Sequence, residues 1–150
     1  MTKQTGGCLC GNIRFEVSGA PGIQVVCHCR MCQRASGAAF MGLIFFEAAD
    51  VKLTGETPKV YQGSETLLRH FCPDCGSPVY VERSSTNRLG ILAGAMDDPG
   101  AFQPTMHICT SSSQTWLKLA DALPSYAEKP PGMSATVTYD VTTGKAKEAS

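Results

Sequence analysis

The spacing of the cysteines constrains this chain more than any other feature of its sequence. Seven of the eight cysteines fall into a C-x-C pair, a C-x-C-x-x-C trio and a C-x-x-C pair: Cys8 and Cys10; Cys27, Cys29 and Cys32; Cys72 and Cys75. The eighth, Cys109, stands alone. Thiols grouped this closely in a reduced protein usually bind metal, so the fold is expected to form around metal sites.

Composition indicates a single cytoplasmic domain without a membrane or nucleic-acid partner. The 150 residues suit one domain, and no apolar run approaches the roughly 20 residues that a membrane helix needs. The N-terminal sequence MTKQTGGCLCG lacks the apolar segment of a secretory signal, so a cytoplasmic location with reduced thiols is expected. The formal net charge is zero, which argues against a nucleic-acid surface or an anionic membrane as partner.

Counting the thiols favours two metal sites of different kinds. Structural zinc takes four ligands, and a site with three protein ligands keeps one position open for water or substrate. If the two pairs form one closed four-thiolate site, the trio remains whole as an open three-thiolate site. The other partition joins the trio to one pair, which gives five sulfurs for one metal and strands the remaining pair.

Several alternatives remain at this point. The cysteines are even in number and could form disulfides, but a C-x-C disulfide is strained. Iron could replace zinc at a four-thiolate site, and a C-x-x-C can be a redox pair. The trio could be a second structural site closed by His70 or His107, whereas His28 is expected to point to the opposite face of an extended segment.

The hydrophobic pattern predicts a mainly antiparallel β fold with short helical turns. Alternating or continuous apolar segments predict strands at residues 13–17, 23–29, 38–50, 51–55, 58–63, 66–71, 77–83, 88–96 and 105–109. A single helical turn is expected at residues 30–36, closed by Gly37, and a helix start near Asp97 or Asp98. Residues 115–126 predict a short helix or a loop.

The C-terminal part reads as an extension of the main domain. We assign residues 1–128 to a zinc-binding domain and 129–150 to an extension, which begins with a linker marked by Pro130 and Pro131. Residues 136–142 alternate as a strand, which could join the edge of this domain or of a second subunit, so a homodimer is one expectation. The last residues, 144–150, are expected to be disordered.

These motifs, in this order, resemble one known family. GGCLCGNIRFEVSG, VVCHCRMCQRASGAAF, GSETLLRHFCPDCGSPVY, LAGAMDDPGAF and MHI are similar to the glutathione-dependent formaldehyde-activating enzyme family, which shares its zinc domain with centromere protein V. The resemblance covers roughly residues 5 to 126 and implies an antiparallel zinc-binding β sandwich of the Mss-four-like type. It implies a structural zinc at Cys8, Cys10, Cys72 and Cys75 and a functional zinc at Cys27, Cys29 and Cys32. Cys109 departs from the pattern, because an aromatic residue is expected there.

The resemblance also implies a reaction. A carbon–sulfur lyase or synthase would bind a small thiol such as glutathione at the open zinc and add it to formaldehyde or a related carbonyl. Coordination lowers the pKa of a thiol, and nearby cations such as Arg30 and Arg34 could offset the negative charge of the complex. Other candidate site residues are His28 and His107 as general bases. Phe40 and Trp116 could line a pocket beside the zinc, but aromatic residues at such positions are more often part of the core.

Two other functions compete with this one. In a non-enzymatic zinc-binding β module for protein interaction, a fourth protein ligand would close the trio. In a redox or metal-storage protein, Cys109 would be exposed and have a low pKa.

Overall fold

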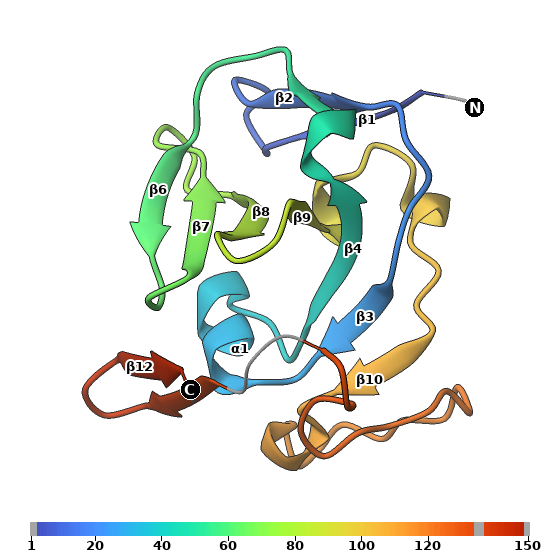
Figure 1. Cartoon of the computed structure of the whole chain (residues 1–150), viewed down its shortest axis with the longest axis vertical. Helices are drawn as coiled ribbons and strands as arrows, with labels where there is room; N and C mark the ends of the chain where they lie inside the picture. Colours follow the sequence, from blue (N-terminus) through green and yellow to red (C-terminus); the bar gives the residue numbers. More distant parts are fainter. Residues whose placement is uncertain (1–2, 134–136, 149–150) are drawn as a thin grey trace.

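The computed structural model describes residues 3–133 and 137–148, and its fold is mainly β, as predicted. A seven-stranded sheet has the order β10-β3-β4-β9-β8-β7-β6, a three-stranded sheet the order β1-β2-β5, and β11 pairs with β12 (Figure 1). The strands are β1 (Gln4–Gly7), β2 (Arg14–Val17), β3 (Gln24–Cys27), β4 (Met41–Glu47), β5 (Val51–Leu53), β6 (Lys59–Gln62), β7 (Leu67–Phe71), β8 (Pro78–Arg83), β9 (Arg88–Leu92), β10 (Met106–Ile108), β11 (Val137–Asp140) and β12 (Lys145–Glu148).

The two larger sheets share one hydrophobic core. In β2, Phe15 and Val17 are buried while their neighbours are partly exposed, which is the pattern of a strand with one covered face. In β4, Leu43 and Ile44 are buried in succession, so both faces of this central strand are covered. This burial explains why the middle of the segment predicted at residues 38–50 forms a strand. The predicted strand is too long, because β4 ends at Glu47 and a 3₁₀ turn follows it.

The strand pairings are antiparallel except for one. β10 runs parallel to β3, with Val26 opposite His107 and Cys27 opposite Ile108. The backbone N–H of His28 continues this ladder by donating to the carbonyl oxygen of Ile108 (3.0 Å). This pairing places His107 and Cys109 close to the end of β3 and the trio, although both residues are far from the trio in sequence.

The helical elements are short. The helix α1 (Arg30–Ser36) ends at Gly37, whose left-handed φ of 68° confirms the predicted C-cap. The strand predicted at residues 88–96 is too long, because β9 ends at Leu92 and one 3₁₀ turn follows; Asp98 caps another such turn. The 3₁₀ turns are η1 (Ala48–Asp50), η2 (Ala93–Ala95), η3 (Pro99–Ala101) and η4 (Thr110–Ser112). Residues 115–126 form a loop, one of the two predicted alternatives.

The C-terminal extension differs from its prediction. β11 falls within the predicted strand, but its partner is β12, in the segment expected to be disordered. Residues 134–136 and 149–150 lie outside the described residues. They include the first residue of the predicted strand and the last two residues of the segment expected to be disordered. The Glu148 carboxylate accepts hydrogen bonds from Ser64 Oγ (2.5 Å) and from the backbone N–H of Thr66 (3.2 Å), so the hairpin is anchored next to β7.

Among the described residues, no helix has the length and apolar character needed to cross a membrane.

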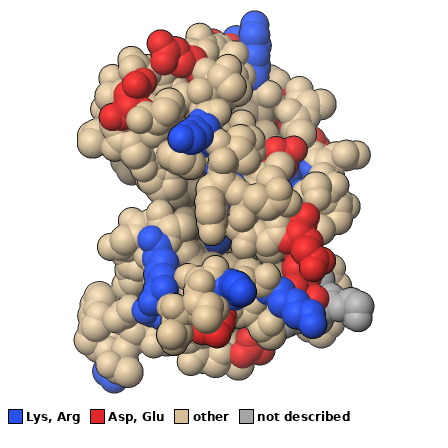
Figure 2. Space-filling view, turned by 90° about the vertical axis from the view of Figure 1, so that its left-hand side faces the viewer, with Lys and Arg blue, Asp and Glu red and all other residues tan. Residues whose placement is uncertain are grey.

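Figure 2 shows several Lys and Arg side chains on the lower half of one face, with Asp and Glu side chains among them. This half holds α1 and the C-terminal hairpin in Figure 1.

Candidate metal centres and thiol site

The first cysteine cluster combines the C-x-C pair with the C-x-x-C pair, although the two pairs are far apart in sequence. Cys8 and Cys10 follow β1, and Cys72 and Cys75 lie in the turn between β7 and β8. All four sulfur atoms lie within 4.8 Å of one another. The Cys10 sulfur is 3.6 Å from that of Cys8 and 3.7 Å from that of Cys72. A tetrahedron with metal–sulfur bonds of about 2.3 Å has edges of about 3.8 Å, so the cluster fits a zinc-sized ion.

Local backbone geometry holds this cluster in place. Gly76 has a φ of 78°, and its N–H donates to the Cys72 carbonyl oxygen (2.9 Å), which closes the C-x-x-C-G turn. The backbone N–H of Ile13 donates to the Cys8 sulfur (3.2 Å). Hydrogen bonds from Ser77 lower the pKa of Cys75 to about 5. These donors stabilise thiolates, the form that binds metal.

The trio forms a second cluster at the junction of β3 and α1. Cys27 ends β3, Cys29 is the N-cap of α1, and Cys32 lies in its first turn. Their sulfur atoms also lie within 4.8 Å of one another. The Cys29 sulfur accepts a hydrogen bond from the backbone N–H of Cys32 (3.3 Å), as an N-cap side chain does. The strand end and the helix start therefore turn three thiols toward a single point.

The three thiols of the trio differ in ionisation. Hydrogen bonds from Cys27 and Cys32 lower the pKa of Cys29 to about 2. The pKa of Cys27 is raised by hydrogen bonding with Cys109 and Cys29 and by burial. A hydrogen bond with Cys27 lowers the pKa of Cys32, but the Cys29 thiolate and burial outweigh it and raise that pKa to about 12. Within the trio, Cys29 is therefore the thiol that ionises first.

Two cations other than the arginines that the sequence suggested act on the trio. Arg69 on β7 points Nη2 at the Cys32 sulfur (4.0 Å), and its charge lowers the pKa of Cys29. Lys129, partly buried, interacts electrostatically with Cys27, Cys29 and Cys109. Arg30 instead hydrogen-bonds Gln33, and Arg34 donates to the carbonyl oxygen of Val141 (2.6 Å) in the C-terminal hairpin.

Sequence reasoning missed Arg69 and Lys129 because both are distant from the trio along the chain. The strand alternation of residues 66–71 was visible, but the sheet order that turns β7 toward α1 was not. Lys129 is positioned by the segment before it, in which the carbonyl oxygen of Glu128 accepts from the Cys109 N–H (2.8 Å).

Cys109 lies beside the trio without joining it. It is buried, and hydrogen bonding with Cys27 lowers its pKa. Its backbone has a left-handed φ of 56°, which is uncommon for a residue other than glycine. A redox or storage thiol was expected to be exposed and to have a low pKa: the pKa of Cys109 is lowered, but the thiol is buried. Its position next to Cys27 is a feature that the sequence did not predict.

The histidines do not supply a fourth ligand to the trio. His70 Nε2 lies 2.9 Å from Glu82 Oε2, and the ring stacks on Tyr80. Both ring nitrogens of His107 have partners: Nδ1 lies 2.9 Å from His28 Nε2, and Nε2 lies 2.8 Å from Asp121 Oδ2. The expected orientation of His28 is confirmed, because its fully buried side chain meets His107 on the next strand.

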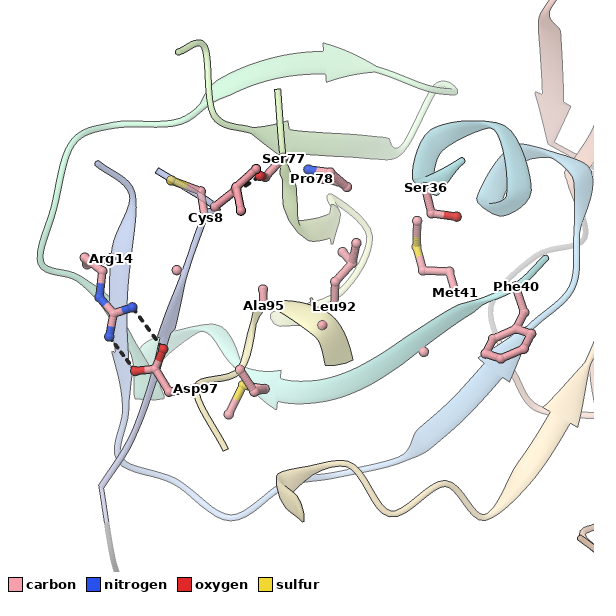
Figure 3. Close-up of a pocket in the computed structure, with 15 residues that line it drawn as sticks. Cys8, Arg14, Ser36, Phe40, Met41, Ser77, Pro78, Leu92, Ala95 and Asp97 are labelled. Atoms are coloured by element: carbon pink, nitrogen blue, oxygen red, sulfur yellow. Dashed lines mark hydrogen bonds and ion pairs between the residues drawn. The ribbon is translucent and has the colours of Figure 1, made fainter. Parts of the chain in front are cut away.

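Phe40 and Trp116 line two different pockets. The pocket in Figure 3 extends from Cys8 and Arg14, which is paired with Asp97, to Ser36 and Phe40. Trp116 is 67% exposed and lines a shallower pocket along α1 together with Arg30 and the polar side chains that flank it. Neither pocket has a trio cysteine among the described residues that line it, so Phe40 and Trp116 do not share a pocket with each other or with the trio thiols there.

Two comparisons place the chain among known proteins. A crystal structure of a Rhodobacter sphaeroides protein, solved as a structural genomics target, is similar to it with a TM-score of 0.50 and 22% sequence identity. The match covers 62% of this chain and 87% of that chain, and it supports the fold alone. A family model described as glutathione-dependent formaldehyde-activating enzyme matches residues 3–112, which is more than half of the chain. With two cysteine clusters able to bind metal ions, the chain belongs to the glutathione-dependent formaldehyde-activating enzyme family.

Proposed function

We propose that this protein is a zinc-dependent carbon–sulfur lyase or synthase that adds a small thiol, such as glutathione, to formaldehyde or a related small carbonyl. The observation that carries the proposal is the contrast between the clusters. Four sulfurs converge in one cluster and three in the other. Among the described residues, no further His, Cys, Asp or Glu has a ligand atom within 4.8 Å of all three trio sulfurs. The open position would take the substrate thiol.

The residues around the trio suit a bound thiolate. Zinc held by Cys27, Cys29 and Cys32 would lower the pKa of a substrate thiol. Three protein thiolates and a substrate thiolate exceed the charge of a zinc dication, and Arg69 and Lys129 offset part of the excess. In the synthase direction the substrate thiol loses its proton, its sulfur forms a bond to the carbonyl carbon as the C=O π bond breaks, and the carbonyl oxygen takes up one proton to become a hydroxyl. The lyase direction reverses these changes.

The other assignments of the site follow from the same proposal. Cys8, Cys10, Cys72 and Cys75 would hold a structural zinc, giving two zinc ions per chain. A glutathione-dependent reaction takes place where that thiol is reduced, which fits a cytoplasmic protein.

Cys109 supports a second candidate function. Its hydrogen bonding with Cys27 puts a fourth sulfur next to the trio, and a shift of this sulfur toward the other two cysteines would close the site. A closed four-thiolate site is structural, so the protein would then be a zinc-binding module for protein interaction without an enzymatic reaction.

The decisive experiment measures exchange between formaldehyde and its glutathione adduct by NMR, with zinc content measured on the same samples. We expect the zinc-loaded protein to accelerate exchange, Cys32→Ser to lose one zinc and the acceleration, and Cys109→Ser to keep both. Cys109→Ser is the matched control because it removes a sulfur beside the same site. Loss of one zinc in Cys109→Ser, without acceleration by the unchanged protein, would instead establish the closed module.

A further inference from the structure

The C-terminal hairpin of β11 and β12 has one face against the domain and one face toward solvent. Val137 lies opposite Glu148 and Tyr139 opposite Ala146, so these four side chains share a face of the hairpin. All four are half-buried, whereas the residues that alternate with them on both strands are exposed. This alternation shows that the hairpin packs on the domain through one face.

The Glu148 carboxylate is the first of two anchors of the hairpin. Its Oε1 accepts hydrogen bonds from Ser64 Oγ (2.5 Å) and from the backbone N–H of Thr66 (3.2 Å), just before β7. The same oxygen pairs with Nη1 of Arg83 at the end of β8 (3.3 Å), and the Glu148 and Arg83 side chains are 10% and 15% exposed. Loss of one partner from an ion pair this little exposed leaves the other charge uncompensated, so this anchor is a strong one.

Arg34 of α1 provides the second anchor. Its Nη1 donates to the carbonyl oxygen of Val141 (2.6 Å), and its Cζ lies 5.9 Å from the centre of the Tyr139 ring. Figure 1 shows the hairpin beside α1. The two anchors therefore make the hairpin a bridge between α1 and the β7–β8 pair.

The helix α1 needs such support, because a helix of seven residues is not stable by itself. It carries Cys29 as its N-cap and Cys32 in its first turn, while Cys27 belongs to β3. A shift of α1 relative to β3 therefore changes the distance from two trio thiols to the third. A shift away from β7 would also part Cys32 from Arg69, whose Nη2 lies 4.0 Å from the Cys32 sulfur.

Lys129 links the first anchor to the trio. Its charge interacts with that of Arg83 and with those of Cys27 and Cys29. Lys129 and Arg83 are both cationic, and Glu148 compensates the charge of Arg83. Glu148 thus reduces the repulsion on a cation that interacts with the trio.

We propose that Glu148 and Arg34 are positioning residues of the trio: through the C-terminal hairpin they hold α1 against β7, so that the three thiols stay close enough to share one metal ion. The inference rests on the proposed function, because it takes the trio as a metal site. The hairpin lies outside residues 3–112, which match the family model. The positioning therefore comes from outside the part of the chain that matches the family.

The test compares the two cysteine clusters within the full-length, zinc-loaded protein. A chelator and an alkylating reagent are added together, and mass spectrometry follows the alkylation of each cysteine as its metal leaves. Glu148→Ala and Arg34→Ala should each speed alkylation of the trio about tenfold, as loss of an outer partner of a metal site does. The four cysteines of the first cluster should react as in the unchanged protein, because Glu148 holds the end of β7 opposite to Cys72.

Two matched variants separate the effect of the hairpin from that of charge alone. Glu65→Ala removes an exposed acid next to the first anchor, and Arg30→Ala removes an arginine that hydrogen-bonds within α1. Both should leave the alkylation rate of the trio unchanged. The double variant of Glu148→Ala and Arg34→Ala should react no faster than the faster single variant, because both changes open the same bridge.

Equal acceleration at both clusters, no acceleration at the trio, an equal effect of Arg30→Ala, or independent effects in the double variant would overturn the positioning role. If the unchanged protein holds no zinc at the trio, the proposed function fails, and alkylation of the metal-free protein then tests the positioning. Cys27 and Cys32 are 5% and 6% exposed, so they should react faster only in the two anchor variants. If both sites hold zinc but the protein does not accelerate formaldehyde exchange, the proposed function fails and the positioning role stands.

Discussion

At the scale of single residues, charge governs what the trio can bind. A three-thiolate zinc site is anionic, and a fourth thiolate adds to the repulsion. Arg69 and Lys129 approach the trio from elements far apart in sequence. The site is partly withdrawn from water. The electrostatic interaction of these cations with the thiolates is therefore stronger than that within the exposed Arg–Glu pairs of the surface.

Replacing Arg69 by Met should weaken zinc binding at the trio about tenfold, as loss of an outer partner of a metal site commonly does. The reason is that the charge facing Cys32 is removed while the length of the side chain is kept. Competition with a zinc chelator, monitored by release of the more weakly held ion, measures the effect. Arg88→Met is the matched control, since Arg88 pairs with Glu47 on the surface; equal weakening in both variants would contradict the role of Arg69.

The ionisation pattern of the trio predicts how its zinc affinity depends on pH. The pKa of about 2 for Cys29 means that this thiol is ionised throughout the neutral range, whereas the raised pKa values of Cys27 and Cys32 keep both protonated without metal. Zinc must therefore displace about two protons, and its affinity should fall about a hundredfold for each unit that the pH falls.

Titrations of zinc into protein whose four-cysteine site is already filled, repeated at several pH values from about 6 to about 8, give the number of protons that zinc displaces. A dependence corresponding to about three protons would show that Cys29 is not ionised beforehand.

At the scale of elements, each cysteine cluster lies where a strand ends. The trio joins the end of β3 to the N-terminus of α1, and the second C-x-x-C lies in the turn between β7 and β8. The strands hold the cysteines that follow them at fixed distances from one another. Few residues would therefore have to become ordered for a cluster to bind metal. The left-handed glycine after Cys75 is the part of this device that a single substitution can test.

Gly76→Ala should destabilise the folded, zinc-loaded protein by about 1 kcal/mol, because a φ of 78° disfavours any residue with a Cβ atom. Gly94→Ala is the matched control: neither glycine has an atom within 4 Å of an added Cβ, but Gly94 is not left-handed. Chemical unfolding measures both free energies. An equal loss in the two variants would mean that the backbone at Gly76 is not what stabilises the turn.

At the scale of the whole molecule, the sequence predicted what depends on local pattern. The β class, the two cysteine clusters and the Gly37 cap follow from spacing and alternation. Sheet order does not, so the parallel pairing of β10 with β3 escaped prediction, and with it the meeting of His28 and His107 and the approach of Cys109. Strand β12 was not predicted because its residues are mostly polar and show no alternation of apolar side chains. Its Glu148 instead accepts hydrogen bonds from Ser64 and Thr66, which attach the hairpin to the domain.

The central claim is that the trio keeps one coordination position for a substrate thiol, and X-ray absorption at the zinc edge tests it most directly. We predict two zinc ions per chain, with an average sulfur coordination below four that rises toward four when glutathione is added. An average that is already four sulfurs, or mixed sulfur and nitrogen, and that glutathione leaves unchanged would contradict the claim and show that the protein itself closes the site.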